Sequence, residues 1–114
     1  EQESQMDIVT ALSGSGPAYF FRIIEALEQA ATGAGLPSQT SRLLAIETAL
    51  GAARLAIEAV ESPAQLRQRV TSPGGTTEAG LAAMEAGHID KVIRDTVAAA
   101  ARRSRELAEQ LGST

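Results

Sequence analysis

Hydrophobic residues recur every three or four positions over most of the chain, a spacing that predicts helices rather than strands. Long helices are expected from about Pro17 to Ala31, from about Ser38 to Val60 and from about Asp90 to Leu111. Shorter helices are expected from about Ser62 to Val70 and from about Thr77 to Glu85. No convincing strand separates them, so the predicted fold class is all-α.

The helix expected from about Ser38 to Val60 has apolar residues around most of its circumference. One stripe consists of Leu43, Ile46, Leu50, Ala53 and Ile57, and a second, of small residues, consists of Thr48, Ala52, Ala56 and Ala59. Its polar side, with Glu47, Arg54 and Glu58, is narrow. Such a helix is buried by more than one neighbour. In a chain of this length, one neighbour is expected to come from another subunit.

The N-terminal part leaves more than one local structure open. Residues 1–5 are polar and are expected to be the end of a linker or a frayed start. Met6–Leu12 fits either a short strand or a short helix. The following Ser13-Gly14-Ser15-Gly16-Pro17 would suit a dinucleotide-binding turn if a strand preceded it. However, the third glycine of that fingerprint is absent and no second strand follows. A tight turn between two helices is the better interpretation, with Pro17 in the first turn of the second.

The most informative stretch is Val70-Thr71-Ser72-Pro73-Gly74-Gly75-Thr76-Thr77-Glu78-Ala79-Gly80-Leu81. Pro73 fixes one backbone angle, and the two glycines that follow are free to adopt positive φ. Thr76 or Thr77 is expected to cap the next helix, with Glu78 in its first turn. Free amides and three hydroxyls would then surround a spot that suits a carboxylate or phosphate. The alternative is a well-capped helix start with no ligand.

Composition narrows the possible functions. The chain has 114 residues, no cysteine and a net charge of −4, which together indicate one domain without disulfides and argue against a nucleic-acid partner. The sequence contains no run of about 18 apolar residues, so nothing argues for a membrane partner. Alanine is frequent and the only aromatics are Tyr19, Phe20 and Phe21, so helices must approach closely and self-association is expected.

Few side chains are suited to acid–base or metal chemistry. His88 is the only histidine and is expected in a surface loop, so no metal site is predicted. Arg67 and Arg69 either supply positive charge to the anion site or are solvated surface residues. Ser13 and Ser15 have no recognisable base beside them, and Tyr19 is better suited to packing than to proton transfer.

Two segments together resemble the signature stretches of pyrroline-5-carboxylate reductase. They are Ala11-Leu12-Ser13-Gly14-Ser15-Gly16-Pro17-Ala18-Tyr19 and Val70-Thr71-Ser72-Pro73-Gly74-Gly75-Thr76-Thr77. Gly35-Leu36-Pro37, Leu50-Gly51-Ala52-Ala53 and Arg102-Arg103-Ser104-Arg105-Glu106-Leu107 also match. The resemblance covers the chain from about Met6.

The resemblance implies an NAD(P)H-dependent oxidoreductase that reduces 1-pyrroline-5-carboxylate to proline, the last step of proline biosynthesis. This chain looks like its C-terminal domain (residues 6–114), an all-helical bundle similar to that of the 6-phosphogluconate dehydrogenase-like dehydrogenases. In the family this domain forms an interleaved homodimer, which can assemble further. NADPH or NADH would be bound mainly by an N-terminal domain that these residues lack, so the chain alone is expected to be inactive. A cytoplasmic location is expected.

The same resemblance assigns roles to the two signatures. Ser72 and the amides of Gly74, Gly75 and Thr76 would hold the substrate carboxylate, and Thr77 would lie near the ring nitrogen as the catalytic residue. The segment from Ser13 through Gly14, Ser15 and Gly16 to Pro17 would face the cofactor. A non-enzymatic helical dimerisation module is the competing class, but it needs no hydroxyl-lined Gly-Gly loop.

Overall fold

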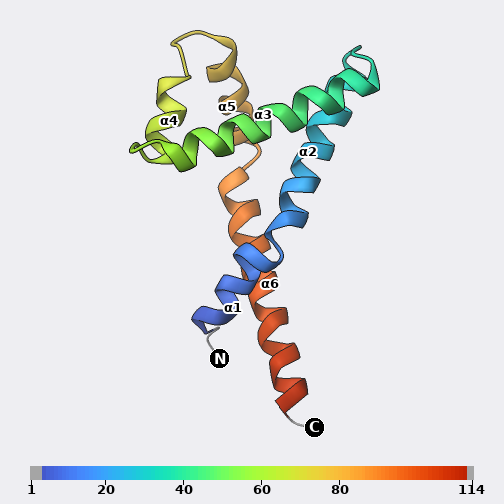
Figure 1. Ribbon diagram of the computed structural model, residues 1–114, viewed down its shortest axis with the longest axis vertical. Helices are drawn as coiled ribbons and strands as arrows, with labels where there is room; N and C mark the ends of the chain where they lie inside the picture. Colours follow the sequence, from blue (N-terminus) through green and yellow to red (C-terminus); the bar gives the residue numbers. More distant parts are fainter. Residues whose placement is uncertain (1–3, 113–114) are drawn as a thin grey trace. The chain divides into compact units, whose positions relative to one another are not determined.

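The computed structural model describes residues 4–112, and within that range the secondary structure is entirely helical (Figure 1). The helices are α1 (Gln5–Val9), the π-helix η1 (Thr10–Gly14), α2 (Gly16–Gly33), α3 (Ser38–Glu58), α4 (Pro63–Arg69), α5 (Thr76–Ala86) and α6 (Ile89–Gly112). The all-α prediction is confirmed, and the expected helix ends lie within about two residues of the observed ones.

The described part of the N-terminal segment begins with the cap of α1. Residues 1–3 lie outside the described range, but Ser4 caps α1 and Gln5 is its first residue. The Ser4 hydroxyl accepts a hydrogen bond from the Asp7 amide, and the Asp7 carboxylate accepts one from the Ser4 amide, which forms a capping box. Met6–Leu12 therefore lies in α1 and η1 rather than in a strand.

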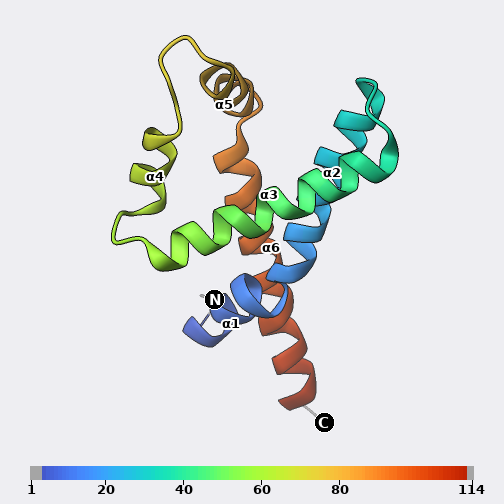
Figure 2. The same ribbon diagram turned by 45° about the horizontal axis from the view of Figure 1, so that its top comes forward.

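The chain divides into two compact units. The first unit comprises residues 1–20 with 83–114, and the second comprises residues 21–82. In the first unit, α1 and η1 pack against α6, which both ribbon views show (Figures 1 and 2). Ala11 and Ala101, both buried, have side chains small enough for the helices to approach closely.

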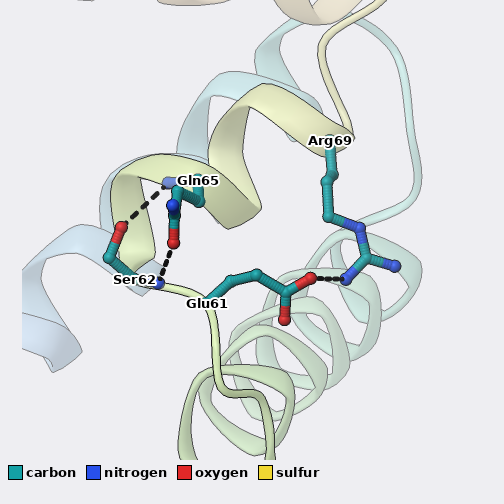
Figure 3. A network of polar contacts seen from close by, with 4 residues as sticks. All are labelled: Glu61, Ser62, Gln65 and Arg69. Carbon is teal, nitrogen blue, oxygen red and sulfur yellow. Dashed lines mark hydrogen bonds and ion pairs between the residues drawn. The ribbon is translucent and has the colours of Figure 1, made fainter.

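The second unit consists of most of α2, then α3, α4 and most of α5. A four-residue connection containing Gly35, with φ of 124°, joins α2 to α3 (Figure 2). At the other end of α3, Ser62 begins α4 through a second capping box, in which Gln65 is the partner (Figure 3).

Large apolar side chains of α3 remain exposed within this chain. Each of Leu43, Leu44, Ile46, Leu50, Leu55 and Ile57 leaves at least 45% of its surface accessible, and only Ser41 and Ala45 of this helix are buried. Large apolar side chains exposed in this number on one helix are typical of a surface that contacts another molecule. The chain therefore has only a small core of its own, as its few large side chains predicted.

Candidate functional site

The loop between α4 and α5 is held by short-range hydrogen bonds. Thr71 donates its hydroxyl hydrogen bond to the carbonyl of Arg67, which secures the end of α4. The Gly75 amide then donates to the Ser72 carbonyl at 3.0 Å, closing a turn over Pro73 and Gly74. Gly74 has φ of 73°, so the turn has the pattern of type II, with proline second and glycine third.

Different structural constraints favour glycine at positions 74 and 75. Gly74 adopts the positive φ that was expected, but Gly75 does not. A Cβ atom on Gly75 would instead lie 3.2 Å from the Ser72 carbonyl oxygen, closer than ordinary contacts. Only one of the two glycines thus uses its freedom to adopt positive φ, and at Gly75 close approach of the backbone is the constraint.

The cap of α5 also differs from the expectation. Gly75 is the N-cap residue, because its carbonyl accepts the first helical hydrogen bond, from Ala79. Thr76 and Thr77 are the first two helical residues, and neither hydroxyl makes a hydrogen bond among the described residues. Glu78 lies in the first turn as expected, and its Oε1 accepts a hydrogen bond of 2.9 Å from the Gly74 amide.

This arrangement decides which amides of the loop remain available. The Gly74 amide donates to the Glu78 carboxylate, and the Gly75 amide donates to the Ser72 carbonyl. The amides of Thr76, Thr77 and Glu78, in the first turn of α5, have no acceptor within residues 4–112. Free first-turn amides carry the positive end of the helix dipole and favour an anion.

A cavity of about 480 Å³ lies between α3, α4 and α5, within the second unit. Its lining is mainly apolar, and Thr77 supplies the only hydroxyl; the lining residues are Ala52, Leu55, Ala56, Pro63, Leu66, Arg67, Arg69, Val70, Thr77 and Leu81. Sequence reasoning missed this cavity, because its walls come from three helices. The spacing of Thr77 and Leu81 by four along α5 was the only available signal.

The two arginines that precede the loop differ in their contacts. Arg69 Nη1 lies 2.8 Å from Glu61 Oε2, so its charge is paired with a residue just before α4 (Figure 3). Arg67 is exposed and makes no side-chain contact of this kind in the described part of the chain. Of the two, Arg67 alone is available to add positive charge near the cavity.

The first signature lies in the first unit, whereas the loop lies in the second. Ser13 donates its hydroxyl hydrogen bond to the Val9 carbonyl at 3.0 Å, and Ser15 donates its amide to Thr10 at 2.9 Å, the bond that closes η1. Gly16 is buried and starts α2 with Pro17 next to it. The structure therefore joins the two helices as expected, but through the π-helical turn η1 and a bend at Ser15 rather than a tight turn, and no strand precedes it among the described residues. A single π-helical turn is frequent at functional sites, and no residue pattern had indicated it.

Other candidate groups stay apart from this site. His88 is exposed between α5 and α6, with φ of 59°. Residues 4–112 contain no group of three or more histidine, cysteine, aspartate or glutamate side chains placed to hold a metal ion. Within the same range, no helix is long and apolar enough to cross a membrane.

Known proteins match both the sequence and the fold. The family model described as pyrroline-5-carboxylate reductase dimerisation matches residues 3–107. The pyrroline-5-carboxylate reductase of Pseudomonas aeruginosa is 48% identical over 112 residues, which are 98% of this chain and 41% of that protein. The Arabidopsis thaliana protein of the same name is 48% identical over 107 residues, 94% of this chain and 39% of that protein.

Solved structures agree. A Coxiella burnetii pyrroline-5-carboxylate reductase has a TM-score of 0.88 at 48% identity, covering 94% of this chain and 40% of that one. The Plasmodium falciparum reductase, solved with NADP bound, has a TM-score of 0.87 at 34% identity, covering 93% of this chain and 42% of that one. The chain thus spans about two fifths of the length of these relatives. With its family model matched over almost all its length, the chain belongs to the pyrroline-5-carboxylate reductase dimerisation family.

Proposed function

We propose that this chain is the dimerising and substrate-binding part of a pyrroline-5-carboxylate reductase, which reduces 1-pyrroline-5-carboxylate to proline. The observation that carries the proposal is the loop from Ser72 to Thr77, which combines free helix amides with unpaired hydroxyls beside a cavity. A dimerisation surface alone does not require that combination. Membership of the family supports this choice of reaction and substrate.

The loop offers a site for the substrate carboxylate. Gly74 and Gly75 shape the turn, since their amides are already hydrogen-bonded within it. The carboxylate would accept from the free amide of Thr76, with the Thr77 amide and the Ser72 hydroxyl beside it. Charge-assisted hydrogen bonds of this kind are roughly twice as strong as neutral ones, which suits a small anionic substrate.

We infer that Thr77 acts on the reacting part of the substrate. Its side chain lines the apolar cavity, where the methylene groups of a pyrroline ring would be shielded from water. Reduction of the C=N bond requires a hydride at carbon and a proton at nitrogen. A nicotinamide cofactor supplies the hydride when bound, and a hydroxyl near the nitrogen favours the protonated imine, the better hydride acceptor.

The cofactor, NADPH or NADH, would be bound mainly by a separate N-terminal domain of the intact reductase. In that assembly Ser13, Gly14, Ser15, Gly16 and Pro17 would face the nicotinamide. The π-helical turn at Thr10–Gly14 supports a functional role for this segment. A cytoplasmic location is part of the same proposal.

The family match supports homo-oligomerisation, and we infer that the exposed apolar surface of α3 is covered by a second copy in an interleaved dimer. The intact reductase, meaning this chain together with its cofactor domain, should convert 1-pyrroline-5-carboxylate to proline at the expense of NAD(P)H. Calorimetric titration of the chain alone with NADPH should show no binding. An intact protein that dimerises but never turns over this substrate would favour the non-enzymatic dimerisation module.

A further inference from the structure

Glu78 makes a contact that the proposed reaction does not use. Its carboxylate Oε1 accepts a hydrogen bond of 2.9 Å from the amide of Gly74, four residues earlier. Gly74 is the residue with φ of 73°, and the next amide along the chain closes the turn onto Ser72. Glu78 therefore connects the first turn of α5 to the left-handed residue of the loop.

The start of α4 shows what the usual arrangement looks like in the same chain. There, the third helical residue, Gln65, bonds to the amide of the N-cap residue Ser62, and the Ser62 hydroxyl accepts from the Gln65 amide (Figure 3). Two backbone amides that lack a partner within the helix thus each gain a side-chain acceptor from the other residue. The two side chains occupy the amides of the N-cap residue and of the third helical residue of α4.

At α5 the third helical residue reaches one position further out. Glu78 bonds to Gly74, the residue before the N-cap, and Gly75 has no side chain with which to return a bond. The first-turn amides of α5 consequently stay free. One side-chain hydrogen bond thus ties the loop to the helix without using the first-turn amides of α5.

We propose that Glu78 is a positioning residue for the substrate loop, an inference that rests on the proposed function of that loop. By holding the Gly74 amide it fixes the turn that places the Ser72 hydroxyl beside the free amides of α5. It also withdraws the Gly74 amide from substrate binding. The role depends on an oxygen acceptor at the end of the side chain rather than on the negative charge.

The test is steady-state kinetics of the intact reductase with Glu78→Ala and Glu78→Gln, accompanied by a thermal melt of each variant. Glu78→Ala frees the loop, so the KM for 1-pyrroline-5-carboxylate should rise about three- to tenfold, while the KM for the cofactor is unchanged and kcat falls less. Glu78→Gln keeps an acceptor oxygen and should stay within about twofold of the unchanged protein. Glu85→Ala is the matched control, because Glu85 is exposed on the same helix.

Three results would overturn the proposal. The first is a Glu78→Ala variant with a lowered melting point and an unchanged KM, which would reduce Glu78 to a helix-stabilising residue. The second is Glu78→Gln behaving like Glu78→Ala, which would assign the effect to charge. The third is unchanged kinetics in Glu78→Ala together with altered kinetics in Ser72→Ala and Thr77→Ala, which would reject the role of Glu78 but keep that of the loop. If none of the three variants has altered kinetics, the proposed function of the loop is itself wrong.

Discussion

Ser104 donates a hydrogen bond of 2.8 Å from its hydroxyl to Oδ1 of Asp7, joining α6 to α1 across 97 positions of the chain. Asp7 also completes the capping box of α1 with Ser4. One carboxylate therefore both starts a helix and attaches it to another. In the first unit, this contact reinforces the close packing around Ala11 and Ala101.

Removing either partner should destabilise the first unit to different extents. Ser104→Ala loses one hydrogen bond and leaves the α1 cap intact, so a melting point a few degrees lower is expected. Asp7→Ala loses the cap as well and should melt lower still. Thermal melts of both variants check this order. Equal melting points for the two variants would mean that the capping box contributes nothing.

The same carboxylate predicts a dependence on pH. The Ser104 hydrogen bond holds the pKa of Asp7 below its usual value of 3.8, more than burial raises it. The ionised carboxylate thus stabilises the fold above that value, and the contribution is lost as pH falls through the lowered pKa. The pKa of Asp95 is also lowered, mainly by its hydrogen bond from Lys91.

Melts from pH 7 to pH 2 should therefore show stability falling at the acid end, with a shallower slope in Asp7→Ala. Asp95→Asn is the matched control, since it removes the other carboxylate whose pKa is lowered and leaves α1 hydrogen-bonded to α6. An Asp7→Ala variant with an unchanged acid slope would contradict the assignment.

His88 predicts a stabilising substitution. It adopts φ of 59°, a conformation that costs side-chain-bearing residues about 1–2 kcal/mol and glycine almost nothing. Glycine also increases the entropy of the unfolded chain, which offsets part of this gain. His88→Gly should still raise the free energy of unfolding by about 0.5–1 kcal/mol. Gly87→Ala is a useful comparison, because Gly87 has no positive φ. A thermal melt in which His88→Gly unfolds below the unchanged protein would contradict this account.

The apolar surface of α3 predicts how the oligomer can be disrupted. The chain should be at least a dimer at micromolar concentration, and Ala52→Glu should dissociate it, because a buried unpaired charge is costly. Arg54→Ala, on the polar side of the same helix, should leave the dimer intact. Sedimentation velocity measures both. A folded, stable monomer of the unchanged chain would contradict the dimer.

Helix periods, Gly and Pro positions and the two signature segments were sufficient to predict the all-α fold, most helix ends and the position of the loop. What they could not predict depended on backbone geometry or on distant residues. The sequence does not reveal that Glu78 reaches back to Gly74, that Gly75 is constrained by the Ser72 carbonyl, or that Ser104 meets Asp7. Nor does the sequence reveal that Ser4 caps α1, because a polar composition suits a linker end, a frayed start and a capping box alike.

Gly75 gives a prediction about the shape of the loop. In Gly75→Val the new Cβ would press against the Ser72 carbonyl, so the turn must shift and turnover should be abolished while the dimer persists. Gly80→Ala is the matched control, because nothing lies within 4 Å of a Cβ built there. Activity assays and sedimentation of both variants check the pair. Substantial turnover by Gly75→Val would show that the observed turn is not required.

Ser72 is expected to act mainly in binding. One lost hydrogen bond to a charged group is worth about 1.5–3 kcal/mol, so Ser72→Ala should raise the KM of the intact reductase for its substrate roughly ten- to a hundredfold. The kcat should change much less, because the carboxylate is held similarly in the ground and transition states. Steady-state kinetics separate the two parameters. A fall in kcat alone would assign Ser72 to the chemical step instead.

The most direct test of the substrate-loop proposal is the kcat of Thr77→Ala in the intact reductase, measured with a thermal melt of the same preparation. If the Thr77 hydroxyl acts on the reacting imine, kcat should fall about tenfold or more, and by a larger factor than KM rises, because the lost interaction strengthens in the transition state. The melting point should remain nearly unchanged, since the hydroxyl makes no hydrogen bond in the described fold. Unchanged kinetics with a lowered melting point would contradict the proposal, and the loop would then be only the start of a helix.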